Sequence, residues 1–349
     1  MKVIINNTTY NAKKGQTILE VARANGIYIP TLCYHEKTGA PARCRVCAVE
    51  VKGAPELVTS CDTLVTEGME IITTSKKVID AQRFVVILAL SSGNHDCITC
   101  EKTGACELQD AAYRLGIEDT DYKRTKYPPH FDDSSAFIKI DHTKCIMCGR
   151  CMEACNNVVV NRVIKLIDRG YEAYMGFDDD LPMGESTCVQ CGECTQICPV
   201  GALTNKKSIG KGREWETEKV RTTCPYCGVG CQLWLHVKDG KIVKVTGVED
   251  GAPNQGRLCV KGRFGYDFIY SGERNTTPLI KENGEFREAS WDEALDLVAS
   301  KFKAIIEKHG PDAVAGVSCA RSINEDSYQM QKLFRAVFKT NNIDHCART

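Results

Sequence analysis

The chain has 349 residues, and its 45 Lys+Arg against 45 Asp+Glu give a formal net charge of zero at pH 7. This balance argues against a nucleic-acid partner, which usually selects for a basic excess. With 43% hydrophobic and 26% charged residues, the chain has the composition of a folded globular protein and not of a disordered one.

The length predicts roughly two or three domains. The longest apolar run, residues 84–90, is far shorter than the ~20 residues of a membrane span. The N-terminal sequence MKVIINNTTYNAKKG has neither an apolar signal core nor a twin arginine, so we expect a cytoplasmic location. Because disulfides are rare in that compartment, the 21 cysteines need another explanation.

The N-terminal region predicts a small ferredoxin domain over residues 1–78. Residues 1–10 alternate like a strand hairpin that turns at Asn6-Asn7, and residues 17–25 form an amphipathic helix closed by Gly26. The first cysteine group, with the spacing C-x10-C-x2-C-x13-C, consists of Cys33, Cys44, Cys47 and Cys61. The strand pair and helix before it suit a β-grasp fold, and the group resembles the [2Fe–2S] domain of hydrogenases, complex I and soluble formate dehydrogenases.

A second cysteine group follows a predicted helix at residues 76–90. The segment HDCITCEKTGACELQD contains His95, Cys97, Cys100 and Cys106. It resembles the [4Fe–4S] site of the same families that is held by one histidine and three cysteines. That site commonly places the histidine four residues before the first cysteine, where this chain has Gly93. We expect His95 to be the ligand; the alternative is a surface histidine with a different fourth ligand. This domain is predicted at 79–134 and ends in a linker that contains Pro128 and Pro129.

An internal repeat predicts a ferredoxin domain with two cubane clusters over residues 135–215. Both halves have the spacing C-x2-C-x2-C-x3-C, at Cys145, Cys148, Cys151 and Cys155, and at Cys188, Cys191, Cys194 and Cys198. In such runs the fourth cysteine binds the other cluster of the pair. The expected ligand sets are therefore Cys145, Cys148 and Cys151 with Cys198, and Cys188, Cys191 and Cys194 with Cys155. Zinc is the alternative for any C-x2-C pair, but an eight-cysteine run leaves little room for it.

The fifth cysteine group lies in a domain predicted at 216–274. A strand hairpin is expected at residues 232–237 and 242–245, with Asp239-Gly240 at its turn. The group, within CPYCGVGC and GRLCVKG, consists of Cys224, Cys227, Cys231 and Cys259. It resembles the N-terminal [4Fe–4S] domain of molybdenum or tungsten bis-pyranopterin oxidoreductases. The resemblance implies that Lys261 relays electrons between cluster and pterin; a solvated surface lysine is the alternative.

The sequence pattern of residues 275–349 predicts the beginning of an α/β domain. Ser290 and Glu293 form a capping box for a helix of about 18 residues, followed by a buried strand at 313–318 and a helix at 326–338. Cys319 is expected to be a buried core thiol. The segment TNNIDHCART resembles the stretch that precedes the selenocysteine or cysteine metal ligand of pterin-dependent formate dehydrogenases. The resemblance implies that position 350 is that ligand and that a selenocysteine codon ends this chain; a natural chain of 349 residues is the alternative.

The predicted fold class is an α+β multi-domain iron–sulfur protein that ends with the start of a molybdopterin oxidoreductase domain. The order of the five cluster motifs resembles the N-terminal half of the catalytic subunit of cytoplasmic, multi-cluster formate dehydrogenases. The resemblance implies reversible oxidation of formate to CO2, one [2Fe–2S] and four [4Fe–4S] clusters (about 18 irons), and a Mo- or W-bis-pyranopterin guanine dinucleotide in the full-length enzyme.

The implied partners are flavin- and NAD(P)-binding diaphorase-type subunits, a ferredoxin or a hydrogenase module. Three alternatives remain open at this point. They are the large iron–sulfur subunit of a complex I-like NADH dehydrogenase, an iron-only hydrogenase, and a stand-alone iron–sulfur electron carrier.

Overall fold

The computed structural model describes residues 1–120, 122 and 131–347. The predicted linker prolines Pro128 and Pro129, and Arg348 and Thr349 of the C-terminal motif, lie outside the described residues. The chain divides into two compact units. The first comprises Met1–Glu218 and His236–Lys244, and the second comprises Lys219–Leu235 and Val245–Thr349.

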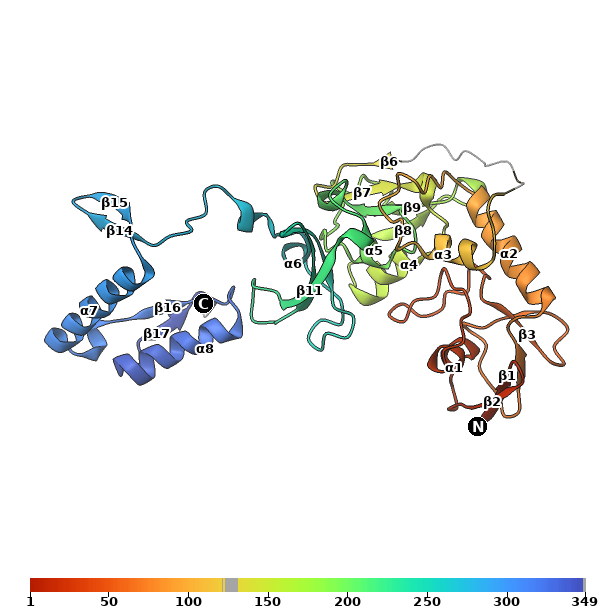
Figure 1. Ribbon diagram of the computed structural model, residues 1–349, viewed down its shortest axis with the longest axis horizontal. Helices are drawn as coiled ribbons and strands as arrows, with labels where there is room; N and C mark the ends of the chain where they lie inside the picture. The colour runs from red at the N-terminus through yellow and green to blue at the C-terminus, as the bar shows by residue number, and fades with distance from the viewer. Residues whose placement is uncertain (121, 123–130, 348–349) are drawn as a thin grey trace. The chain divides into compact units, whose positions relative to one another are not determined.

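The N-terminal domain is a five-stranded sheet with one helix (Figure 1). Its elements are β1 (Lys2–Ile5), β2 (Thr8–Asn11), α1 (Ile18–Ala24), β3 (Ala48–Val51), β4 (Val58–Thr59) and β5 (Glu70–Ile72). The strand order is β2-β1-β5-β3-β4, with β1 antiparallel to β2 and parallel to β5.

Local sequence explains why these elements form. Asn6 and Asn7 adopt φ values of 49° and 65°, the left-handed conformation that a tight hairpin turn requires. Thr17 accepts a hydrogen bond from the Glu20 amide while the Glu20 carboxylate accepts one from the Thr17 amide, so a reciprocal capping box begins α1. The predicted hairpin, helix and β-grasp arrangement are confirmed.

Two helices follow the sheet: α2 (Lys76–Ser91) and α3 (Glu107–Arg114). Gln82 of α2 donates to the carbonyl oxygen of Ala48 in β3 at 2.9 Å, which fixes the helix against the sheet. A single hydrophobic core joins the loops of the N-terminal domain, α2, α3 and the end of the cysteine repeat through Leu32, Val46, Val86, Leu108, Cys198 and Val200. The predicted helix at residues 76–90 is confirmed.

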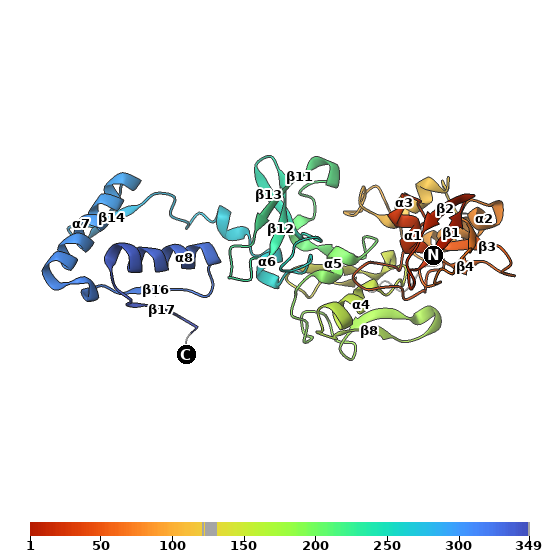
Figure 2. The same ribbon diagram turned by 90° about the horizontal axis from the view of Figure 1, so that it is seen from below.

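The cysteine repeat folds as two similar halves. Its elements are β6 (Phe131–Asp132), β7 (Ile138–Asp141), α4 (Arg150–Glu153), β8 (Ile164–Ile167), β9 (Tyr174–Phe177), α5 (Glu193–Ile197) and β10 (Leu203–Asn205). Gly149 and Gly192 precede the two helices with φ values of 80° and 74°. Met147 and Gln190, two residues earlier, both have φ 54°. Figures 1 and 2 show α4 and α5 side by side.

The next segment is a three-stranded sheet of order β11-β12-β13, with β11 (Glu218–Thr223), β12 (Gln232–Lys238) and β13 (Lys241–Gly247), followed by α6 (Val260–Phe264). Asp239 and Gly240, at φ 51° and 71°, make the turn between β12 and β13. The predicted hairpin is confirmed.

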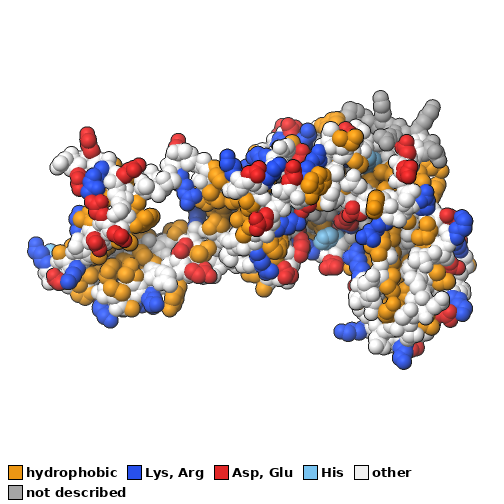
Figure 3. Space-filling model, in the orientation of Figure 1, with side chains coloured by type: hydrophobic (Ala, Val, Ile, Leu, Met, Phe, Trp, Pro, Cys, Tyr) orange, Lys and Arg blue, Asp and Glu red, His pale blue; other side chains and the backbone are white. Residues whose placement is uncertain are grey.

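The C-terminal region is a hairpin followed by a small α/β unit. Its elements are β14 (Leu279–Glu282), β15 (Glu285–Glu288), α7 (Trp291–His309), β16 (Gly316–Ser318), α8 (Asn324–Lys332), a π-helical turn (Leu333–Phe338) and β17 (Ile343–His345). The strands β16 and β17 pair in parallel. Apolar side chains of α7 such as Leu295 and Val298 are exposed, and apolar atoms gather over this segment in Figure 3.

Two predictions for this region need correction. Ser290 accepts a hydrogen bond from the Glu293 amide at 3.1 Å, but the Glu293 carboxylate pairs with Arg287, so only half of the predicted capping box forms. The predicted buried strand at 313–318 is wrong in extent and burial. The strand comprises only Gly316–Ser318, and although Val314 is buried, Val317 is 77% exposed on the open face of the two-stranded sheet.

Candidate metal centres

The cysteines of the repeat meet across its two halves. Four of them, with apolar neighbours that include Ile140, Ile164 and Phe177, line one cavity. These four, called the Cys145 site, are Cys145, Cys148, Cys151 and Cys198. The structure therefore brings the fourth cysteine of the second half to the first three of the first half.

The remaining four cysteines, called the Cys188 site, are Cys155, Cys188, Cys191 and Cys194. Burial, together with the charges of Cys191 and Cys155, raises the pKa of Cys188 to about 11. Cys194 is buried at the start of α5, and its charge also acts on Cys151 of the neighbouring site.

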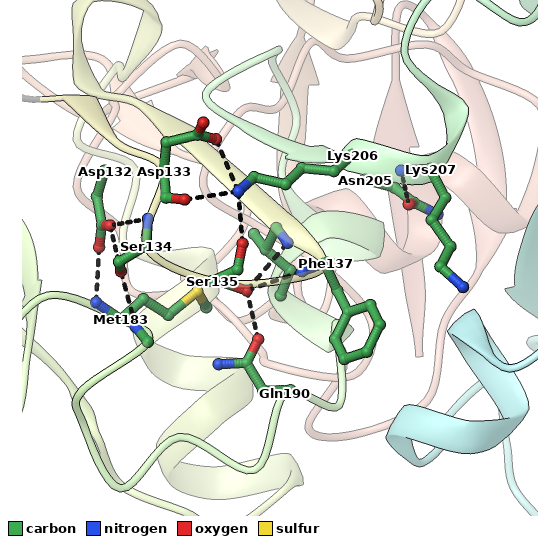
Figure 4. Close-up of polar contacts among 12 residues, drawn as sticks. Asp132, Asp133, Ser134, Ser135, Phe137, Met183, Gln190, Asn205, Lys206 and Lys207 are labelled. Carbon is green, nitrogen blue, oxygen red and sulfur yellow. Dashed lines mark hydrogen bonds and ion pairs between the residues drawn. The ribbon is translucent and has the colours of Figure 1, made fainter.

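A polar network anchors the loop of the Cys188 site (Figure 4). Ser135 accepts hydrogen bonds from the amides of Phe137 and Ile138, both at 3.1 Å, and its hydroxyl donates to Gln190, which lies between Cys188 and Cys191. The Lys206 ammonium binds the Asp133 carboxylate at 2.8 Å. The segment before β7 thus holds the second cysteine loop in place.

The pKa values of the cysteines in the Cys145 site indicate whether these thiols could bind a positively charged iron–sulfur core. Burial raises the pKa of Cys145 to about 12. Burial also raises the pKa of Cys151 well above its usual value, and the charges of Cys148 and Cys145 add to the effect. Buried thiolates repel one another unless a cation lies among them, and metal coordination deprotonates a thiol outright. The donor set therefore fits iron in a cluster.

The first cysteine group, called the Cys33 site, consists of Cys33, Cys44, Cys47 and Cys61. A hydrogen bond from Cys44 lowers the pKa of Cys33 to about 6, and one from Cys61 lowers the pKa of Cys47 to about 7. The charge of Cys33 acts on both Cys47 and Cys61. The structure therefore brings all four members together.

The second group, called the Cys97 site, consists of His95, Cys97, Cys100 and Cys106. Burial, together with the charge of Cys100, raises the pKa of Cys106 to about 11. The His95 Nε2 atom lies 2.9 Å from the carbonyl oxygen of Ala89. A metal-bound histidine commonly donates its second ring nitrogen to such a carbonyl, so this contact suits ligation through Nδ1.

The structure also accounts for the glycine at position 93. A Cβ atom on Gly93 would lie 2.1 Å from the Thr143 carbonyl oxygen, far inside the contact distance of two heavy atoms. The Asn94 amide donates to the same oxygen at 2.7 Å. This backbone excludes any side chain at the position where the family commonly has its histidine.

The fifth group, called the Cys224 site, consists of Cys224, Cys227, Cys231 and Cys259. Burial raises the pKa of Cys224, the charges of Cys259 and Cys227 add to the effect, and the charge of Lys261 opposes it. The Cys224 amide donates to the Cys231 carbonyl oxygen at 2.8 Å. Lys261 lies in α6, which begins directly after Cys259, and its Nζ is 5.8 Å from the centre of the Tyr226 ring.

The two cysteines outside the groups lie at the ends of neighbouring strands. Cys319 follows β16 and Cys346 follows β17, and their Sγ atoms are 3.5 Å apart. Cys319 is only half-buried, so the prediction of a buried core thiol is wrong. Over residues 1–120, 122 and 131–347, no three His, Cys, Asp or Glu side chains converge on a position for a single metal ion.

Five family models match the chain in succession. They are a 2Fe-2S iron-sulfur cluster binding domain (residues 1–76), an NADH-ubiquinone oxidoreductase-G iron-sulfur binding region (82–121), a 4Fe-4S dicluster domain (144–202), a molybdopterin oxidoreductase Fe4S4 domain (217–271) and a molybdopterin oxidoreductase domain (274–349).

The chain is similar along almost its whole length to curated proteins that share one name. Proteins named "Putative formate dehydrogenase" from Staphylococcus aureus strains USA300, MRSA252 and N315 are 35% identical to the chain over 386 residues, an alignment that covers 99% of this chain and 39% of theirs. The chain resembles the N-terminal part of a formate dehydrogenase alpha subunit.

The formate dehydrogenase-like chain spans 39% of the length of these curated relatives. Among solved structures it is similar to an NAD+-reducing [NiFe]-hydrogenase in the H2-reduced state. The sequence identity is 28% and the TM-score 0.57, over 60% of this chain and 89% of that chain. The predicted fold class, iron–sulfur domains followed by the start of a molybdopterin oxidoreductase domain, is confirmed. The exact domain boundaries stay predictions.

The described part of the formate dehydrogenase-like chain contains no helix with the length and apolar character needed to cross a membrane. Sequence reasoning missed Arg150 and Glu193, which are almost completely buried and directly precede cysteines of the repeat. They occupy equivalent positions in the two cysteine runs, but that position alone does not mark a charged residue as buried.

Proposed function

We propose that the chain is the electron-transfer part of a formate dehydrogenase that catalyses reversible oxidation of formate to CO2. The whole enzyme would hold a Mo- or W-bis-pyranopterin guanine dinucleotide. The order of the matched domains carries this proposal, because a molybdopterin oxidoreductase segment follows four iron–sulfur segments in one chain. The full-length similarity to the Staphylococcus aureus proteins favours formate as the substrate.

Each of the five sites would hold one cluster: [2Fe–2S] at the Cys33 site and [4Fe–4S] at the other four. Such clusters supply one-electron carriers whose potentials depend on charge, hydrogen bonds and burial. The shared cavity of Cys145, Cys148, Cys151 and Cys198 supports the exchange of fourth ligands between the two halves of the repeat.

This chain's own residues would do three things in the reaction. Its buried thiolates hold the clusters and exclude water from them, and the Ala89 carbonyl orients His95 as a ligand. Lys261, next to the Cys224 site, would relay electrons from the pterin. Electrons would then pass to the Cys188 and Cys145 sites and onward to the Cys97 and Cys33 sites.

The electron acceptor would be a partner with flavin and NAD(P), a ferredoxin or a hydrogenase module, in the cytoplasm. The match to an NADH-ubiquinone oxidoreductase-G region and the similarity to an NAD+-reducing hydrogenase support this class of partner. The same match favours a second candidate, a complex I-like iron–sulfur subunit. Formate-dependent reduction of the clusters in the whole enzyme would distinguish the two functions.

The ligand exchange can be tested by counting iron in the anaerobically prepared enzyme, where this chain should contribute about 18 irons. The Cys198→Ala and Cys145→Ala variants should each lose one cubane, and the double variant should lose no more than either alone. The Cys198→Ala/Cys188→Ala double variant should lose two cubanes. Additive loss in the first pair would contradict the assignment.

A further inference from the structure

The two halves of the cysteine repeat carry opposite buried charges at equivalent positions. Arg150 lies between Gly149 and Cys151, and Glu193 lies between Gly192 and Cys194. Arg150 is 1% exposed and Glu193 is 2% exposed. A buried charge is costly unless it is paired, so both residues require an explanation in terms of their surroundings.

Arg150 forms a two-pronged ion pair with Glu107, the first residue of α3. Its Nη1 and Nη2 atoms lie 2.5 and 2.6 Å from the two carboxylate oxygens. An arginine guanidinium stays protonated in proteins. Arg150 directly precedes Cys151, and its Nη1 also lies 3.5 Å from the carbonyl oxygen of Ile197, the residue before Cys198.

Glu193 has the opposite environment. Its carboxylate pairs with the Lys37 ammonium at 3.1 Å, and the carboxylate is almost completely buried. The next residue, Cys194, belongs to the Cys188 site. Each half of the repeat thus has one buried member of an ion pair directly before its third cysteine, a cation in the first half and an anion in the second.

Backbone next to the Cys145 site contacts backbone next to the Cys97 site. The Glu107 amide donates to the Pro199 carbonyl oxygen at 2.9 Å. Glu107 directly follows Cys106, and Pro199 directly follows Cys198, so a single hydrogen bond joins backbone segments that carry one ligand of each site. Gly201 approaches the same loop, since a Cβ atom there would lie 2.5 Å from the Cys100 sulfur.

We propose that the buried charges of Arg150 and Glu193 separate the reduction potentials of the two cubanes, so that the Cys145 cubane lies above the Cys188 cubane and electrons gather beside the Cys97 site. Reduction adds negative charge to a cluster. A nearby cation therefore stabilises the reduced form and a nearby anion the oxidised form. This inference rests on the proposed function and its ligand assignment.

The test is a redox titration of the whole enzyme followed by EPR, with iron analysis of each variant. The Cys155→Ala and Cys198→Ala backgrounds each keep one of the two cubanes, so each potential can be assigned. Arg150→Gln should lower the potential of the Cys145 cubane, and Glu193→Gln should raise that of the Cys188 cubane. Each shift should correspond to at least a tenfold change in the reduction equilibrium, about 59 mV for one electron.

Two controls separate charge from structure. Arg150→Lys keeps the charge and should keep the potential. Lys165→Gln removes a half-exposed ammonium that pairs with Asp179 at 3.1 Å in the same domain, and it should shift neither cubane. A purely structural role of Arg150 would reduce iron content without a specific change in potential.

Unchanged potentials in Arg150→Gln and Glu193→Gln, or shifts of the same sign in both, would overturn the proposal. If Arg150→Gln loses iron, the Glu193→Gln variant becomes the decisive test. An unchanged reduction potential of the Cys188 cubane in that variant would then overturn the proposal. Failure of the proposed function would look different. The unsubstituted enzyme would lack about 18 irons or would not be reduced by formate.

Discussion

Replacing Gly201 with alanine should empty the Cys97 site. The added methyl carbon would lie 2.5 Å from the sulfur of Cys100, whereas non-bonded heavy atoms prefer roughly 3.5–4.0 Å. The sulfur must therefore retreat by about 1 Å, at a cost typical of overpacking, ~1–3 kcal/mol. Metal sites tolerate ligand displacements of only about 0.2 Å, so the cluster should be lost before the fold.

Iron analysis and EPR of the anaerobically prepared enzyme measure this effect. Iron in this chain should fall from about 18 to about 14 per molecule, with loss of the signal of the histidine-ligated cluster. Gly272→Ala is the matched control, because no atom lies within 4 Å of a Cβ at that position. A Gly201→Ala variant with its full iron content and an unchanged spectrum would refute the reasoning.

Three further outcomes are expected. His95→Ala should lose the same cluster. Adding Gly93→His should not restore it, because a Cβ at position 93 would lie 2.1 Å from a backbone carbonyl oxygen. Recovered iron in the double variant would contradict this. Ser135→Ala should lower the free energy of unfolding of the repeat by about 1–3 kcal/mol in urea, because the amides of Phe137 and Ile138 and the Gln190 side chain lose their hydrogen-bond partner. An unchanged urea midpoint of unfolding would contradict this prediction. Lys261→Met should keep its iron but slow formate-driven reduction of the clusters more than tenfold, while reduction by dithionite is unaffected; equal rates with formate would exclude the relay role.

The cysteines that the structure brings together were predictable where their spacing in the sequence is short. The two runs of C-x2-C-x2-C-x3-C place three sulfurs around one cubane whatever the rest of the chain does. The hairpin at Asn6-Asn7 and the capping box at Thr17 were predictable for the same reason. Each depends on residues at most three positions apart.

The supporting residues were not predictable because their partners lie far along the chain. Arg150 pairs with Glu107 and Glu193 pairs with Lys37. Nothing near either residue in the sequence distinguishes a buried charge from a solvated one. The strand prediction at 313–318 failed for a related reason. An apolar run is buried only where other elements cover it, and Val317 is exposed.

The exchange of fourth ligands between the halves of the repeat has a consequence for how the protein is made. Cys151 leaves the ribosome well before Cys198, yet both line the same cavity. During synthesis the first half alone presents three thiolates and an incomplete pocket. With the proposed ligand sets, neither site would be complete until the second half has been translated and has folded back. The Cys188 site needs the chain up to Cys194, and the Cys145 site needs it up to Cys198.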